Sequence, residues 1–227
     1  MNPRLLIAVA ALALLLVGQH HRSALEVPPK WAWDQGHVEV PDGVSVVVDL
    51  RPDVPGYDRS CKAGRGCVFG PAWTDDVDVR HGGNGCDQRS DVLRDSLKQI
   101  QIKPNTNGCV VASGILHDPY TGQSVAYQRT GNTEVVADHV VPLAAAWDLG
   151  ASQWTQRKRQ NFANDPRNLI ITTSGANLAK GDKTPGEWMP EHNQCRYAQA
   201  YLEVVRAYAV ATTRADEHAL AVAASRC

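Results

Sequence analysis

Short apolar runs separated by polar turns fill the chain from residue 44 onward, and their lengths predict an α+β domain. The run at residues 44–50 is rich in β-branched residues, which favours a buried strand. Ser90 is the expected N-cap of the first helix, and residues 118–122 have the composition of a turn. We expect strands at residues 44–50, 109–116, 124–129, 134–138 and 168–172, and helices at residues 91–99, 143–149, 155–162, 174–180, 194–211 and 216–225.

The N-terminal segment has the pattern of an export signal. Arg4 precedes an unbroken apolar run at residues 5–17, which is shorter than the roughly 20 residues of a spanning helix. No small-x-small cleavage site follows Gly18, so an uncleaved N-terminal anchor stays open. We expect residues 1–25 to be a signal peptide or anchor, residues 26–43 an extended lead-in, and residues 44–227 one domain.

All six cysteines lie beyond this signal, and an even number in an exported chain favours disulfides. One pair flanks a glycine-bearing loop, and another pair begins and ends the C-terminal helix pair, whose ends would meet if the helices are antiparallel. The expected bridges are Cys61–Cys67 and Cys195–Cys227, and the two cysteines that remain give Cys86–Cys109.

A zinc site is the alternative for the middle cysteines. Its ligands would be His81, Cys86, Cys109 and His117. The chain has no CxxC pair, which disfavours this alternative.

Charge adds little to the case for any particular partner. The 227 residues carry a net charge of −1, so no global basic field gathers a polyanion. Binding of nucleic acid would need a local patch, or the same side chains could form a solvated helix face. The candidates for that patch are Arg157, Lys158, Arg159, Arg167, Lys180 and Lys183.

Four polar residues at the ends of apolar segments have the chemistry of a hydrolytic site. Asp138 and His139 are consecutive at the end of a strand, so their side chains leave opposite faces. Asn177 lies on the helix after the next strand, which Asn168 begins. A carboxylate and an amide oxygen suit a hard cation, and a neutral imidazole can take a proton from water. Each residue alone has an ordinary structural explanation, but their order and spacing together favour a site.

The segment from residue 138 to residue 185 resembles the HNH nuclease motif of the ββα-metal fold. The pattern is D-H-V-V-P, then N-L before an apolar run, then N-x-x-K-G-D. It is most similar to the HNH module of GmrSD-like restriction nucleases and of small exported bacterial HNH proteins. The likeness extends to residues 56–59, 69–78, 84–87, 118–122 and 154–168, whereas the loop at residues 60–68 looks like an insertion with its own cysteine pair.

The resemblance implies a role for each motif residue. Asp138 and Asn177 would be ligands of one Mg²⁺ or Mn²⁺ ion, and His139 would be the general base. Asn168 would hold the base or its loop through hydrogen bonds. The residues that could contact substrate phosphates are Lys180, Arg157, Arg167 and Lys183.

The expected protein is thus a ββα-metal nuclease with additional strands, a C-terminal helix pair and disulfides, and its motif spans about residues 134–182. It would cut DNA, or RNA, and leave 5′-phosphate and 3′-hydroxyl ends, outside the cytoplasm or anchored facing outside, with no obligate protein partner. The alternative is a non-catalytic nucleic-acid-binding module or a cell-surface interaction module with this fold.

Two further features have open interpretations. Asp75, Asp76 and Asp78 could bind Ca²⁺ or form an exposed loop, and we favour the loop. Trp147 and Trp154 are expected to be core residues.

Overall fold

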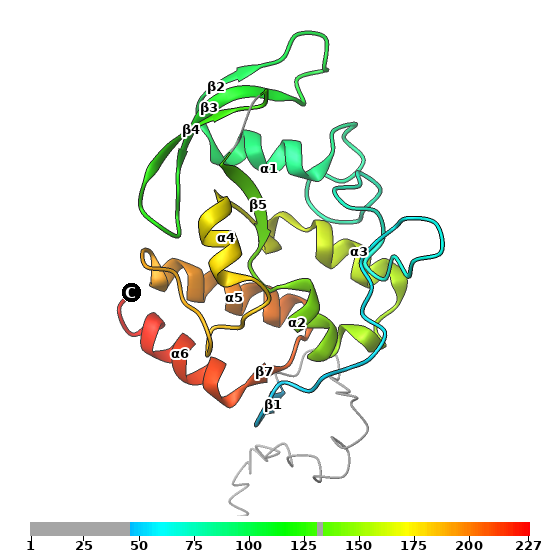
Figure 1. Ribbon diagram of the computed structural model, residues 1–227, viewed down its shortest axis with the longest axis vertical. Helices are drawn as coiled ribbons and strands as arrows, with labels where there is room; N and C mark the ends of the chain where they lie inside the picture. The colour runs from blue at the N-terminus through cyan, green and yellow to red at the C-terminus, as the bar shows by residue number, and fades with distance from the viewer. Residues whose placement is uncertain (1–45, 131–133) are drawn as a thin grey trace, which may run out of the picture.

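The computed structural model describes residues 46–130 and 134–227, so the predicted signal segment and lead-in lie outside the described residues. The elements form the expected mixed α+β fold, with the C-terminal helices at one end and a small sheet at the other (Figure 1). They are β1 (Val47–Val48), α1 (Gln88–Ser96), β2 (Lys98–Ile102), β3 (Val111–His117), β4 (Ser124–Gln128), β5 (Val135–His139), α2 (Leu143–Asp148), η2 (Ala151–Gln153), α3 (Gln156–Asn164), η3 (Pro166–Asn168), β6 (Leu169–Thr173), α4 (Ser174–Lys180), α5 (Gln194–Tyr208), β7 (Thr212–Thr213) and α6 (Arg214–Ala224).

Two antiparallel strands and a short helix make the centre of the molecule. β5 pairs with β6, with Asp138 opposite Ile170 and His139 opposite Leu169. Thr173 ends this strand pair and caps α4, because its hydroxyl accepts a hydrogen bond from the Ala176 backbone N–H. β5, β6 and α4 follow one another in the order strand, strand, helix, with α2, η2, α3 and η3 between the two strands.

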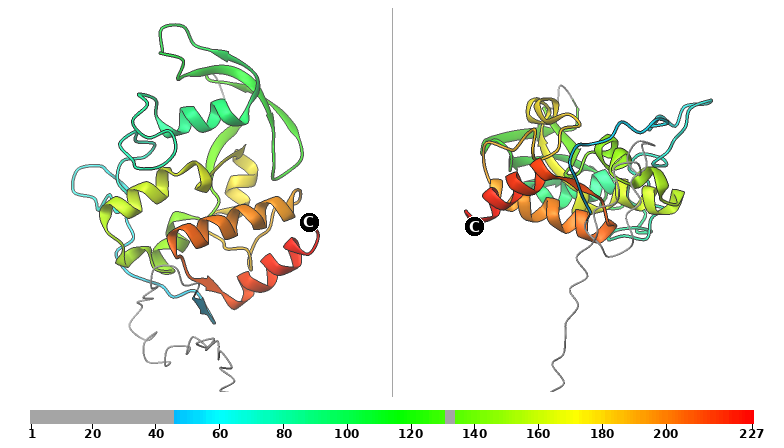
Figure 2. Two further views of the ribbon diagram at one scale, coloured as in Figure 1. Left: turned by 180° about the vertical axis from the view of Figure 1, so that it is seen from behind. Right: turned by 90° about the horizontal axis from the view of Figure 1, so that it is seen from below.

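Two hydrophobic cores support this centre from opposite sides. The smaller core lies under α1 and the three-stranded sheet β2–β3–β4, and it includes Leu93, Leu116 and Tyr127. The larger core is built on α5, whose Tyr201 and Val204 are fully buried in one cluster with apolar residues of α2 and α6. Helices α5 and α6 lie side by side (Figure 2), as the sequence predicts.

Several element boundaries differ from the sequence prediction, most of all at α1 and β1. Asp87 caps α1 in place of Ser90, because its carboxylate accepts the Ser90 backbone N–H at 2.9 Å. The expected helix over residues 91–99 ends at Ser96, and residues 98–102 form strand β2, whose alternate Ile100 and Ile102 pack against the smaller core.

The expected strand at residues 44–50 is also shorter than predicted. Only Val47–Val48 pair with β7, in parallel, and Leu50 lies 83% exposed. β7 offers just Thr212 and Thr213 before α6 begins, so the ladder has no partner for a longer strand.

The three expected disulfides are all present, and they join Cys61 to Cys67, Cys86 to Cys109, and Cys195 to Cys227. Cys86 and Cys109 are both in a disulfide and cannot be zinc ligands, so the alternative zinc site is wrong. Among the described helices, none has the length and apolar character needed to cross a membrane.

Candidate active site

Two adjoining cavities meet at the C-terminal end of β5. The larger, of about 690 Å³, is lined by Asp138, Asn177 and the C-terminal end of α4. The smaller, of about 340 Å³, lies under residues 69–73. His139 lines both cavities, so the motif residues share one open cleft with a side pocket.

His139 is held in one orientation by its surroundings. Its Nε2 lies 2.9 Å from the Ala163 carbonyl oxygen, and a carbonyl only accepts, so Nε2 carries the proton. Trp73 stacks on the imidazole with the two ring planes 8° apart. Nδ1 is left with a free lone pair, since the described residues give it no hydrogen-bond partner.

The imidazole is kept neutral at physiological pH. Burial among protein atoms lowers the pKa of His139 to about 4, and the positive charges of Lys180 and Arg59 act in the same direction. The hydrogen bond to Ala163 and the charge of Asp138 oppose this shift without cancelling it. A neutral imidazole with a free Nδ1 can accept a proton.

Asp138 is only 6% exposed, yet it lines the larger cavity. The Tyr120 hydroxyl donates to Oδ2 at 2.9 Å, and burial raises the pKa of Tyr120 well above its usual value, so this donor stays protonated. The Lys180 ammonium lies 3.0 Å from the same oxygen and 3.2 Å from Oδ1. A carboxylate has about four acceptor positions, so room remains for one further ligand on the cavity side.

Lys180 occupies a different place from the one that we expected. Its side chain is fully buried, and Nζ also donates to the His139 carbonyl oxygen at 2.7 Å. Burial lowers its pKa, and the charge of Asp138 partly opposes this. An ammonium enclosed in this way cannot reach a phosphate in the cleft; it instead ties α4 to β5.

Asn177 faces the larger cavity from α4. Its side chain is partly buried and makes no hydrogen bond within the described part of the chain. Gly181 ends α4 with a φ of +59°, a left-handed conformation that glycine adopts without strain. Asn177 and Asp138 lie on the wall of one cavity. An amide oxygen beside a carboxylate fits Mg²⁺ or Mn²⁺, which take oxygen ligands and keep several waters.

Asn168 fixes the loop that follows the histidine. It is completely buried, and its Oδ1 accepts the Val141 backbone N–H at 2.8 Å. Its Nδ2 donates to the carbonyl oxygens of Val141 and Phe162. These bonds have the form expected for a residue that holds the base in position, and its catalytic effect stays a prediction.

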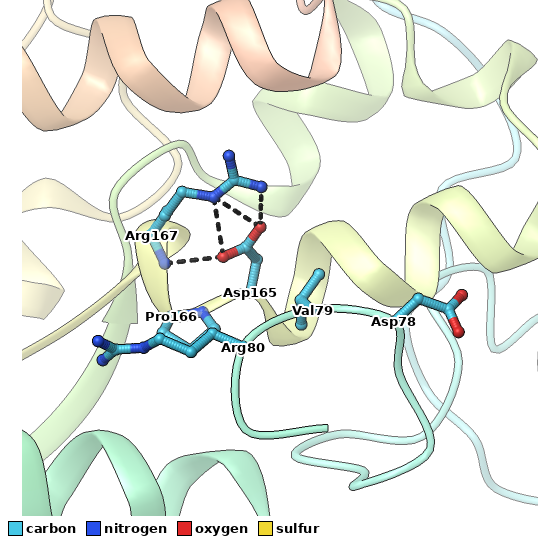
Figure 3. Close-up of a pocket in the computed structure, with 6 residues that line it drawn as sticks. All are labelled: Asp78, Val79, Arg80, Asp165, Pro166 and Arg167. Atoms are coloured by element: carbon cyan, nitrogen blue, oxygen red, sulfur yellow. Dashed lines mark hydrogen bonds and ion pairs between the residues drawn. The ribbon is translucent and has the colours of Figure 1, made fainter. Parts of the chain in front are cut away.

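The predicted basic patch does not line the cleft. Arg157 forms ion pairs with Asp78 and Asp76, at 2.6 Å and 2.8 Å. Figure 3 shows Arg167 turned onto Asp165, at the edge of a separate pocket that Asp78 also lines.

The remaining members of the patch also lie elsewhere. Lys158 lies over the Trp154 ring, and Arg159 donates to the Val68 carbonyl oxygen. Lys183 is exposed beyond α4, where its ammonium donates to the Ala179 carbonyl oxygen. Proximity in sequence to the motif therefore did not place these cations beside it.

The acidic cluster is a structured loop. Asp75 accepts the backbone N–H groups of Asn84 and Gly85, while Asp76 and Asp78 bind Arg157. In the described residues no three His, Cys, Asp or Glu side chains converge as metal ligands, which agrees with the loop interpretation. Trp147 is buried in the larger core and Trp154 packs against it, as expected.

Sequence reasoning missed two residues of the cleft, Arg59 and Trp73, which line both cavities. They lie in motifs shared with the exported group, and that was the available signal. Sequence reasoning also assigned no role to Asp182 of the motif. Arg51 bridges Asp182 to Asp148 at the end of α2, with contacts of 3.0 Å and 2.7 Å.

Known proteins place this chain in a family. A secreted protein of the fungus Arthroderma benhamiae, itself uncharacterised, is 36% identical over 146 residues, which cover 63% of this chain and 68% of the relative. No solved structure matches the chain. Residues 87–222, more than half of the sequence, match the C-terminal domain of the GmrSD restriction endonucleases. The chain therefore belongs to the GmrSD C-terminal domain family.

Proposed function

We propose that the chain is an HNH endonuclease that uses one divalent cation to hydrolyse phosphodiester bonds of DNA. The observation that carries the proposal is the position of His139, which lines the same cleft as Asp138 and Asn177 and whose Nδ1 has no hydrogen-bond partner among the described residues. The family relationship to restriction endonucleases supports the same activity.

In the proposed reaction, a water molecule attacks the phosphorus and His139 Nδ1 takes its proton. The imidazole can do so because burial keeps it neutral, and because Ala163 and Trp73 hold its ring in place. The bond to the 3′ oxygen breaks and this oxygen takes a proton from solvent water, which leaves 5′-phosphate and 3′-hydroxyl ends. Asn168 and Lys180 touch no substrate; they position the backbone around His139.

Asp138 and Asn177 would hold Mg²⁺ or Mn²⁺ through one carboxylate and one amide oxygen. A cation bound there supplies positive charge that stabilises the phosphorane-like transition state and the leaving oxygen. Lys180 and Tyr120 keep the carboxylate of Asp138 in place for this purpose.

We further propose that the protein acts outside the cytoplasm. Three disulfides brace the described residues, and such bridges persist in oxidising compartments. The fungal relative is described as secreted.

Cleavage of supercoiled plasmid DNA tests the proposal. The purified protein is incubated with EDTA, Mg²⁺, Mn²⁺ or Ca²⁺, and a structured RNA is assayed in parallel. We expect nicking with Mg²⁺ or Mn²⁺ and none with EDTA. Lack of cleavage of both nucleic acids with every metal, from a folded protein, would contradict the proposal and favour a binding module.

A further inference from the structure

The cleft has an unusual charge balance for a site that would bind a phosphodiester. Asp138 and Asp182 line the larger cavity and repel an anion. Among the described residues that line the two cavities, Arg59 is the only lysine or arginine. Lys180 is buried behind Asp138 and contributes no exposed donor. A phosphate in this cleft therefore meets one protein cation.

The guanidinium of Arg59 is available for a ligand. The residue is exposed, and within residues 46–130 and 134–227 its side chain has no hydrogen bond or ion pair. Arg51, Arg157 and Arg167 differ in this respect, because carboxylates engage each of them. A free guanidinium has five donors in a planar arrangement that suits two phosphate oxygens.

Arg59 also lies beside the proposed base. It lines both cavities together with Trp73, His139 and Leu143. Its charge is one of those that lower the pKa of His139, which agrees with this proximity. A phosphate attacked by water next to His139 would thus lie in a cavity that Arg59 lines.

The backbone on each side of Arg59 is braced. Asp58 accepts the Gly66 and Ser60 backbone N–H groups, and its carbonyl oxygen accepts the Val68 N–H at 3.0 Å. The Cys61–Cys67 bridge closes the same loop. On the other side the Tyr57 ring packs against Phe69 and Trp147. The loop at residues 60–68 thereby holds the backbone at Arg59 in place.

We propose that Arg59 binds a non-bridging oxygen of the phosphate that is cut, and that the disulfide-closed loop at residues 60–68 holds it there. This inference rests on the proposed nuclease function. Negative charge on the phosphate oxygens rises in the transition state, so a fixed guanidinium stabilises that state more than the bound substrate.

Single-turnover cleavage of a labelled DNA duplex at saturating enzyme tests the inference. Arg59→Ala should lower the saturating rate constant roughly 10- to 100-fold, the range for loss of a charge-assisted hydrogen bond. Arg59→Lys should recover part of this loss. The matched control is Arg206→Ala, which removes an exposed arginine from α5 and should leave the rate unchanged.

A binding measurement in EDTA gives a second readout. The slope of log K against log salt should fall by about 0.9 in Arg59→Ala, as expected for one lost phosphate contact. The Cys61→Ser/Cys67→Ser pair should lower the saturating rate less than Arg59→Ala does, and should add nothing when combined with it.

The outcomes separate this inference from the proposed function. Wild-type protein that cleaves DNA, with Arg59→Ala equally fast at saturation, would overturn the inference alone. A normal saturating rate with weaker binding would assign Arg59 to a neighbouring phosphate and likewise overturn it. A wild-type protein that cleaves nothing would refute the nuclease function itself.

Discussion

The Lys180 ammonium lies 3.0 Å from a carboxylate oxygen of Asp138, and both residues are buried. The pair joins the last residue of α4 to β5, and Asn177 lies one helical turn before Lys180. The spacing between the two proposed metal ligands is therefore set by an ion pair beneath the cleft. The lysine of the N-x-x-K-G-D motif thus has a structural explanation.

Replacement of Lys180 should destabilise the fold. Lys180→Met leaves a buried carboxylate without its partner, which typically costs about 3–5 kcal/mol. Urea unfolding measures this, with the exposed Lys183→Met as control, for which a change within about 0.5 kcal/mol is expected. Unchanged stability together with a weaker salt dependence of DNA binding would mean that Lys180 contacts phosphate after all.

Asn177→Ala should weaken the use of metal. It removes one of two protein oxygen ligands, so the rate at limiting Mg²⁺ should fall about a hundredfold, equivalent to ~2.7 kcal/mol. Asn177→Asp should retain most of the metal affinity because it keeps an oxygen ligand. Gln199→Ala, which removes an exposed amide side chain from α5, is the control. An unchanged Mg²⁺ half-saturation concentration in Asn177→Ala would refute the ligand assignment.

The His139 imidazole should stay neutral far below its usual titration range. Its pKa is lowered to about 4 from the usual 6.5, so in the metal-free protein its NMR signals should not titrate between pH 8 and pH 5. Between about pH 6.5 and pH 4, His139 is protonated in the unfolded chain but stays neutral in the folded protein. The contribution of His139 to stability therefore falls as the pH drops through this window. A midpoint near 6.5 would contradict the buried, tethered ring.

Loss of a disulfide should cost more stability when the loop that it closes is longer. Cys195 and Cys227 are 32 residues apart, whereas Cys61 and Cys67 are 6 residues apart. The chain-entropy relation gives about 4 kcal/mol for the long loop and about 2 kcal/mol for the short one. Urea unfolding of the two paired Cys→Ser variants tests this order. Equal losses, or a larger loss for the short loop, would show that other effects dominate.

The site centre was predictable because its signals are local. Asp138 and His139 end a strand with a clear apolar pattern, and Asn177 lies on the short helix that follows the partner strand. The disulfides were predictable for a similar reason, since the cysteines mark the ends of a loop and of a helix pair.

What sequence reasoning missed depends on contacts between distant segments. Arg157 was expected at the cleft, but Asp78, which is 79 residues away, binds it. Arg59 reaches the cleft only because the loop after β1 packs against α2. The helix predicted at residues 91–99 overlaps the first two residues of strand β2, and the rest of this strand was not predicted, since its pattern becomes visible only beside β3.

Cleavage by His139→Ala tests the central claim most directly. Single-turnover cleavage of a DNA duplex is measured at saturating Mg²⁺, beside His218→Ala, which removes an exposed histidine from α6. We predict a rate 10²- to 10⁴-fold below wild type for His139→Ala, the usual loss for a general base, with folding and DNA binding retained. His218→Ala should cleave at the wild-type rate. A His139→Ala rate equal to wild type would contradict the account.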